Sequence, residues 1–247
     1  MDPQRLLVSD LDGTLLGDVE AAARFSDWFT ARRDRWRLAY ATGRTLTSVM
    51  DLVRTGALIA PDAIVSNVGT EIHDPAGDRW PDWPSEDPAW DVDGVARTMA
   101  TLPGISPQAP DAQTAVKASY HAIDLSDASL ADIRSRLADD GLDATLIYSA
   151  GRYLDVLPAW GGKARATGFL AAAWGFELDQ VVVSGDSGND LDMLESGVLA
   201  IVVRNAGPEL DHLAGERIYR ARAAYADGVL EGLRHWEATA PAAVGVA

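Results

Sequence analysis

The chain has 247 residues, of which 47% are hydrophobic, with no cysteine and a formal net charge of −16 at pH 7. This length suits one large domain or a core with a modest inserted module, and the lack of cysteine excludes a disulfide framework and thiol chemistry. The acidic balance argues against nucleic acid or an anionic membrane as a partner, because both require a basic surface.

The first candidate site segment follows a short apolar run at residues 5–8, which predicts a buried strand. Asp10 and Asp12 come directly after it, and Gly13 and Thr14 turn the chain. Residues two apart on an extended chain point to the same side, so both carboxylates could face one phosphate. One could attack it and form an aspartyl-phosphate while the other moves a proton. The string is also compatible with a solvated acidic turn.

The second segment follows another predicted strand at 36–40. Thr42, Gly43 and Arg44 then lead into an amphipathic run whose apolar residues have helical spacing. A hydroxyl and free backbone N–H groups at a helix start can bind an anion. Thr42 is equally compatible with a plain helix N-cap.

The middle of the chain predicts a separate module. Residues 62–72 indicate a strand that enters a glycine turn and returns, and a Pro- and Trp-rich crossing at 80–84 resists regular structure. We place an α+β cap domain at 80–157, between core segments 1–79 and 158–247. Its expected elements are helices at 92–102 and 129–140 and strands at 114–123, 145–148 and 153–157.

The third segment is Gly162-Lys163, at the start of a predicted helix that runs to residue 173. A cation is electrostatically misplaced at a helix N-terminus, which is the positive end of the helix dipole. A bound phosphate would reverse this penalty, which favours a functional role over an ordinary solvated lysine.

The fourth segment follows a strongly apolar strand at 181–184. Asp186, Asp190 and Asp192 crowd together there, and Mg²⁺ prefers such oxygen ligands. An EF-hand is excluded because Leu191 occupies the position that requires glycine. We expect Asp192 to lie on a solvated helix face rather than to bind metal.

These strands, with one more at 199–203, alternate with helices and predict an α/β fold. The core would be a doubly wound parallel sheet of Rossmann type, with the α+β cap inserted into it. Asp10, Thr42 and Asp186 would then meet at the carboxyl edge of the sheet, where open α/β sheets bind ligands.

The four segments, in this order, resemble the haloacid dehalogenase superfamily of phosphatases. The resemblance implies that Asp10 is the nucleophile and Asp12 the general acid and base. It also implies phosphate contacts from Thr42, Gly43 and Lys163, and Mg²⁺ as the cofactor. The implied metal ligands are Asp10, Asp12 through its backbone carbonyl, Asp186 and Asp190.

Several further strings are similar to sucrose-phosphate phosphatases and mannosylfructose-phosphate phosphatases. They include residues 67–72, 116–120, 154–158 and 185–190, and they do not separate the two families. The resemblance implies a small-molecule sugar phosphate as substrate, most specifically a disaccharide phosphate such as sucrose 6-phosphate. The implied substrate contacts are Arg44, Gly69, Thr70, Glu71, Lys117 and Asn189. Lys117 is equally compatible with a charged residue on the outer face of a cap strand.

Other functions remain open at this point. A phosphomutase would need cap cations for a second phosphate, and the cap offers few Arg or Lys residues. A phosphoacceptor signalling module and an inactive sugar-phosphate-binding protein are the non-enzyme alternatives. Tryptophans 80, 83 and 90 are interpreted mainly as packing anchors and less as sugar platforms. No apolar run approaches the length of a membrane span, and we expect a cytoplasmic protein. A monomer is compatible with the sequence. We expect the end of the chain from residue 237 to fray.

Overall fold

A computed structural model describes residues 4–84 and 87–239. Within these residues, the larger sheet has seven strands in the order β11-β10-β9-β1-β2-β3-β4. Its neighbours pair in parallel, except for the antiparallel pair β3 and β4. The strands are β1 (Arg5–Ser9), β2 (Trp36–Ala41), β3 (Ala63–Ser66), β4 (Glu71–His73), β9 (Val181–Gly185), β10 (Leu199–Val202) and β11 (Ile218–Arg220).

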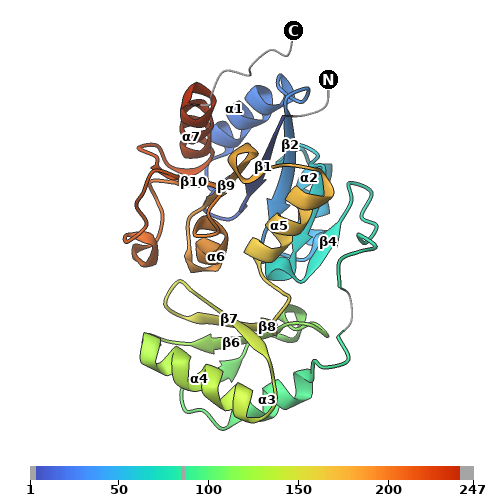
Figure 1. Ribbon diagram of the computed structural model, residues 1–247, viewed down its shortest axis with the longest axis vertical. Coiled ribbons are helices and arrows are strands. Elements are labelled where there is room, and N and C mark those ends of the chain that lie inside the picture. Colours follow the sequence, from blue (N-terminus) through green and yellow to red (C-terminus); the bar gives the residue numbers. More distant parts are fainter. Residues whose placement is uncertain (1–3, 85–86, 240–247) are drawn as a thin grey trace.

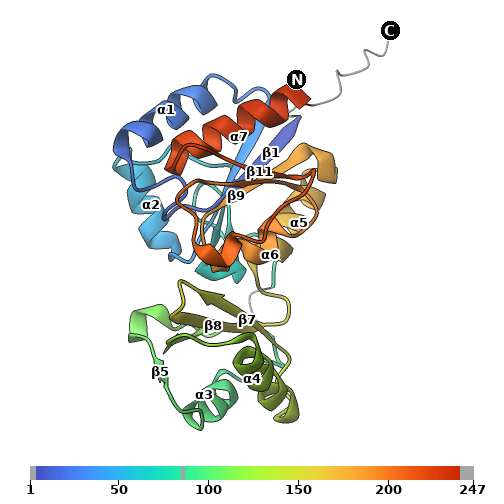
Figure 2. The ribbon, with the colours of Figure 1, turned by 90° about the vertical axis from the view of Figure 1, so that its left-hand side faces the viewer.

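Helices cover both faces of this sheet, which is why its central strands read as unbroken apolar runs. Alternate residues of one strand serve opposite layers: Leu7 packs in one hydrophobic cluster, and Leu6 and Val8 pack in the other. Figure 2 shows α1 and α7 on one side of the sheet and α5 and α6 on the other. The core helices are α1 (Val19–Thr30), α2 (Leu46–Arg54), α5 (Lys163–Ala173), α6 (Leu191–Leu194) and α7 (Tyr225–Thr239).

The smaller sheet is antiparallel, in the order β5-β6-β8-β7, and belongs to the cap. Its strands lie between the core and the helices α3 and α4, which occupy the far end of the molecule (Figure 1). A hydrophobic cluster that includes Val95, Ile133 and Leu154 joins the two layers. The elements are α3 (Val92–Ala100), β5 (Ile105–Pro107), β6 (Ala118–Ala122), α4 (Asp127–Asp139), β7 (Ala144–Ser149) and β8 (Tyr153–Pro158).

The predicted doubly wound core with an inserted α+β cap is confirmed. Two details were wrong. The strand expected at 114–123 begins only at Ala118, because Thr114 N–H donates to the Lys117 carbonyl (3.0 Å) and turns the chain there. The chain end predicted to fray from residue 237 continues α7 as far as Thr239, and residues 240–247 lie outside the described residues. In the described part of the chain, no helix has both the length and the apolarity to cross a membrane.

Candidate active site

The four segments converge at the carboxyl ends of neighbouring strands. Asp10 follows β1, Thr42 follows β2 and Asp186 follows β9, while Lys163 opens α5. Pairing of β1 with both β2 and β9 sets these ends side by side, and Asp10 N–H donates to the Ser184 carbonyl across them (2.9 Å). The parallel register therefore brings together residues from distant parts of the chain.

Lys163 is the centre of the cluster. Its ammonium is fully buried and donates to Oδ1 of Asp190 (2.6 Å), Oδ1 of Asp10 (2.7 Å) and Oδ1 of Asn189 (3.1 Å). Burial alone would lower the pKa of Lys163, but the charges of Asp10 and Asp190 outweigh it and raise that pKa above its usual value. Lys163 therefore stays charged and uses all three of its donors.

Nearby carboxylates compensate the charge of Lys163 at the start of α5, contrary to the expectation from the sequence. Asp192, expected on a solvated helix face, is half-buried, and its Oδ2 accepts from Ala164 N–H at the start of α5 (3.0 Å). A carboxylate at a helix N-terminus is stabilising. Asp192, together with Asp10 and Asp190, offsets the unfavourable position of the lysine, so a phosphate is not required to explain it.

Three carboxylates lie close together beside this one buried cation. Oxygens of Asp10, Asp186 and Asp190 lie within 4.8 Å of one another. Burial raises the pKa of Asp10 to about 8 and that of Asp186 to about 7, and the charge of Asp190 adds to both shifts. Lys163 opposes the shift at Asp10 without cancelling it. The excess negative charge and the all-oxygen donor set fit a hard divalent cation such as Mg²⁺.

The loop that carries these acids is held from several sides. Thr14 donates its hydroxyl to Oδ1 of Asp186 (3.1 Å). Oδ2 of Asp190 accepts from the N–H groups of Asp186 (2.9 Å) and Ser187 (3.1 Å). Asp190 thus braces the loop through its Oδ2 and bonds to Lys163 through its Oδ1. The contact from Thr14 was not recognised in the sequence, although Thr14 belongs to the first motif.

Asp12 lies apart from the buried acids. Its exposed carboxylate accepts two hydrogen bonds from Arg44, both of 2.6 Å, and Arg44 also donates to the Ser48 hydroxyl (2.9 Å). A bidentate guanidinium pair fixes the orientation of a carboxylate more firmly than a single contact does. Arg44, expected among the substrate contacts, thus holds Asp12 in this structure.

Thr42 is buried and is not the N-cap of the following helix. Its hydroxyl oxygen accepts from Arg44 N–H (3.1 Å), whereas Thr45 caps α2 by accepting from Ser48 N–H. The capping alternative for Thr42 is therefore wrong. Its hydroxyl proton is free to be donated elsewhere. Gly43 follows it, on the side of the cluster where Asn189 lies.

The segment at residues 69–71, which contains three of the expected substrate contacts, is held by packing and hydrogen bonds of its own. Gly69 packs directly on the Gly162 backbone, and the fully buried Thr70 donates its hydroxyl to the Asn67 carbonyl (3.0 Å). Glu71 accepts from Ser66 and Asn67, and also contacts His73 and Arg79. Hydrogen bonding, chiefly with His73, lowers the pKa of Glu71 to about 2.

Lys117 is buried in the turn before β6 rather than in a strand. Its ammonium lies 4.0 Å from Oδ1 of Asp155, which also accepts from the Ser119 hydroxyl (2.5 Å). The alternative, a solvated residue on the outer face of a cap strand, is therefore wrong, because the side chain is buried.

The tryptophans of the crossing act as packing anchors. Trp80 packs edge-on against Phe169 and Trp174, and Trp83 packs against Phe169 and Trp160. Such clusters join the crossing to α5. The packing interpretation therefore accounts for Trp80 and Trp83 without a sugar. Trp90 similarly donates its indole N–H to the Ala115 carbonyl (3.1 Å).

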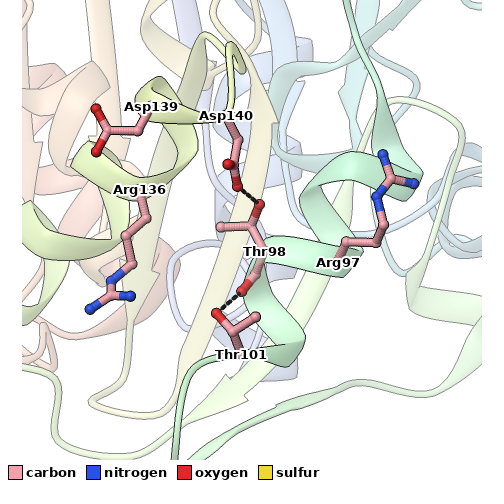
Figure 3. Close-up of a pocket in the computed structure, with 6 residues that line it drawn as sticks. All are labelled: Arg97, Thr98, Thr101, Arg136, Asp139 and Asp140. Carbon is pink, nitrogen blue, oxygen red and sulfur yellow. Dashed lines mark hydrogen bonds between the residues drawn. The ribbon is translucent and has the colours of Figure 1, made fainter.

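A hollow of about 460 Å³ lies on the cap between α3 and α4, away from the acid cluster. Figure 3 shows its two arginines, Arg97 and Arg136, pointing away from one another. Each already pairs with an acid, Arg97 with Asp91 and Arg136 with Asp132. They do not converge on a shared anion, so this hollow does not support the second phosphate site that a mutase would need.

The fold, with an acid cluster at the carboxyl edge of the sheet and an inserted cap, identifies the class of protein. The chain is a phosphatase of the haloacid dehalogenase superfamily. The profile of the "Sucrose-6F-phosphate phosphohydrolase" family matches residues 3–237, and the chain belongs to that family. The predicted membership of the superfamily is thereby confirmed.

Individual relatives agree with this assignment. A mannosylfructose-phosphate phosphatase of Agrobacterium fabrum is 36% identical, over 96% of this chain and 98% of the relative. A Synechocystis sucrose-phosphatase, solved in complex with sucrose and phosphate, is 33% identical, with a TM-score of 0.88 over 95% of this chain and 98% of that one. A haloacid dehalogenase subclass IIB sugar phosphatase, 13% identical with a TM-score of 0.70 over 94% and 99% of the two chains, shares the fold.

Proposed function

We propose that this chain is a Mg²⁺-dependent phosphatase of a disaccharide phosphate, with sucrose 6-phosphate as the first candidate substrate. Mannosylfructose phosphate is the second candidate, because the Agrobacterium relative carries that name at 36% identity over nearly its whole length. The single observation that carries the proposal is the buried contact of Lys163 with Asp10 and Asp190, beside Asp186. In this proposal residues 80–157 form the cap, and 1–79 with 158–247 form the core.

Asp10 is the proposed nucleophile. In the proposed reaction its carboxylate oxygen forms a bond to phosphorus while the bond to the sugar oxygen breaks, which leaves an aspartyl-phosphate. Lys163 and the Thr42 hydroxyl hold the phosphoryl oxygens, so that charge and alignment rather than covalent help lower the barrier. Water then attacks phosphorus, and the carboxylate of Asp10 is regenerated with release of inorganic phosphate.

Asp12 serves the leaving group. It gives a proton to the departing sugar oxygen and later takes one from the attacking water, which is worth on the order of 10²- to 10⁴-fold in rate. Arg44, bonded to Asp12 by two 2.6 Å contacts, sets the position from which Asp12 acts.

The metal ligands would be Asp10, Asp186 and the backbone carbonyl of Asp12, with Asp190 supporting the loop. When bound, Mg²⁺ supplies positive charge that neutralises the phosphoryl oxygens. Gly69, Thr70, Glu71, Lys117 and Asn189, with Arg44, would recognise the sugar. Thr70 would use its backbone for this contact, because its side chain is buried.

The test is release of inorganic phosphate from a panel of sugar phosphates, with Mg²⁺ and with a chelator. Sucrose 6-phosphate or mannosylfructose phosphate should be turned over fastest, and only with Mg²⁺. Asp10→Asn should fold and bind substrate but release no phosphate. Turnover by that variant, or no turnover of any sugar phosphate by the native chain, would refute the proposal.

A further inference from the structure

The cap and the core touch at a point outside the buried acid cluster. The end of the β7–β8 hairpin, residues 148–151, lies against the core turn Gly188–Asp190. A Cβ atom at Gly188 would lie 2.4 Å from the Tyr148 carbonyl oxygen and 3.2 Å from Cα of Ser149. Only glycine allows the two backbones to approach so closely, so the contact depends on the identity of this residue.

One carboxylate joins the two sides of this contact. Oε1 of Glu209 accepts from the N–H of Gly188 in the core (3.0 Å) and from the N–H of Ala150 in the cap (3.4 Å). Ala150 has a φ of 51°, which is uncommon for a residue other than glycine. The cap hairpin thus adopts an unfavourable backbone conformation at the residue whose N–H faces Glu209.

The segment that carries Glu209 is also bonded to the acid cluster. Gly207 N–H donates to the backbone carbonyl of Asp186 (2.7 Å). The turn beside it carries Asn189 and Asp190, both of which accept from Lys163. A short path of hydrogen bonds therefore connects the cap hairpin, Glu209, the Gly188–Asp190 turn and Lys163.

The contact is open to water and can be broken. Glu209 is half-buried, and it lines, with Tyr148 and Gly188, a cleft of about 540 Å³ between the cap and the core. If the cap moved away, the carboxylate would remain solvated, so no buried unpaired charge would oppose the movement. A contact of this kind suits a cap that must open and close in each catalytic cycle.

We propose that Glu209 is a positioning residue that couples closure of the cap to the placement of the Gly188–Asp190 turn beneath Lys163. This proposal rests on the proposed phosphatase function. In this proposal Glu209 acts through Asn189 and Asp190, the residues that follow its partner Gly188. If Glu209 only stabilised the start of the turn, its substitution would affect large and small substrates equally. If Glu209 couples the cap to the turn, its substitution should affect the larger substrate more.

The kinetic test compares a sugar phosphate with a small aryl phosphate, whose turnover should depend less on contacts with the cap. Glu209→Ala should lower kcat/KM for sucrose 6-phosphate by about 10- to 100-fold, and shift its ratio to the aryl phosphate by about tenfold or more, because misplacement by about 1 Å costs this much. Glu209→Gln keeps an acceptor oxygen and should lose less. Glu216→Gln, which alters an exposed carboxylate of the core domain, is the control and should match the native chain. Equal losses on both substrates, or none, would overturn the proposal.

Closure is measured separately, with spin labels. The chain has no cysteine, so Ser135→Cys in α4 and Ala214→Cys in the core give two unique, exposed labelling sites. With Mg²⁺ and inorganic phosphate, the Glu209→Ala background should shift the label distances to longer values than the native background. Identical distance distributions would overturn the coupling. If the native chain turns over neither substrate, the proposed function fails, while the label distances still decide whether Glu209 holds the cap.

Discussion

Without metal, the protein should lose stability as the pH rises from about 4 to about 8. The pKa of Asp10 is raised to about 8 and that of Asp186 to about 7, mainly by burial, whereas an unfolded aspartate titrates near 3.9. Between these values the folded state binds more protons than the unfolded state. Stability therefore falls with pH, which is the opposite of the usual behaviour of a salt-bridged carboxylate.

The slope of the unfolding free energy against pH follows from the number of carboxyl groups whose pKa is raised. Each group contributes about 1.4 kcal/mol per pH unit while it is protonated in the folded state and ionised in the unfolded state. From pH 5.5 to 6.5, two such groups give an upper bound of about 3 kcal/mol. Mg²⁺ binds the ionised acids. At 100 times its Kd at pH 7.5 it should stabilise the protein by about 2.7 kcal/mol, and the same concentration should stabilise it less at pH 5.5, where protons compete for the acids.

The assay is chemical denaturation across this pH range, in chelator and in Mg²⁺. Asp10→Asn should reduce the slope in chelator. Glu71→Gln is the control, because the lowered pKa of Glu71, about 2, gives a contribution that is lost only as the pH falls below about 4.5. Two results together would contradict this pH dependence: stability in chelator that is flat or rises between pH 5 and 7.5, and no extra gain from Mg²⁺ at the higher pH.

Two further substitutions test the packing of Gly69 and the role of the cap residue Lys117. Gly69→Ala should cost about 3 kcal/mol or more, because φ is 87° and the new Cβ would lie 2.3 Å from the Gly162 backbone; a loss below about 1 kcal/mol in denaturation would contradict this packing. Lys117→Ala should raise KM for a disaccharide phosphate much more than for a small aryl phosphate. Steady-state kinetics check this, and equal effects on both would remove Lys117 from sugar recognition and leave its pairing with Asp155 as its role.

The strand ends that carry Asp10, Thr42 and Asp186 could be predicted because each follows a continuous apolar run in a parallel sheet. The short strands β5 and β11, of three residues each, were not predicted, since so few residues give no clear periodicity.

Side-chain partners were harder to predict than strand ends. Lys163 was found from its place at a helix start, but its bonds to Asp10 and Asp190 span 153 and 27 residues of sequence and depend on tertiary packing. Asp192 looked like a solvated residue because helical spacing does not reveal that a second helix begins beside it. The contact of Glu209 with Gly188 and Ala150 involves backbone N–H groups, which every residue except proline carries, so no sequence pattern marks it.

In the proposed reaction, Asp10 and a magnesium ion held by Asp186 act on the same phosphorus atom. A crystal structure with Mg²⁺ and beryllium fluoride, a mimic of the phosphoryl group, tests it most directly. We expect beryllium fluoride on the Asp10 carboxylate and Mg²⁺ about 2.1 Å from oxygens of both Asp10 and Asp186. An adduct on another residue, or a metal that contacts neither acid, would contradict it.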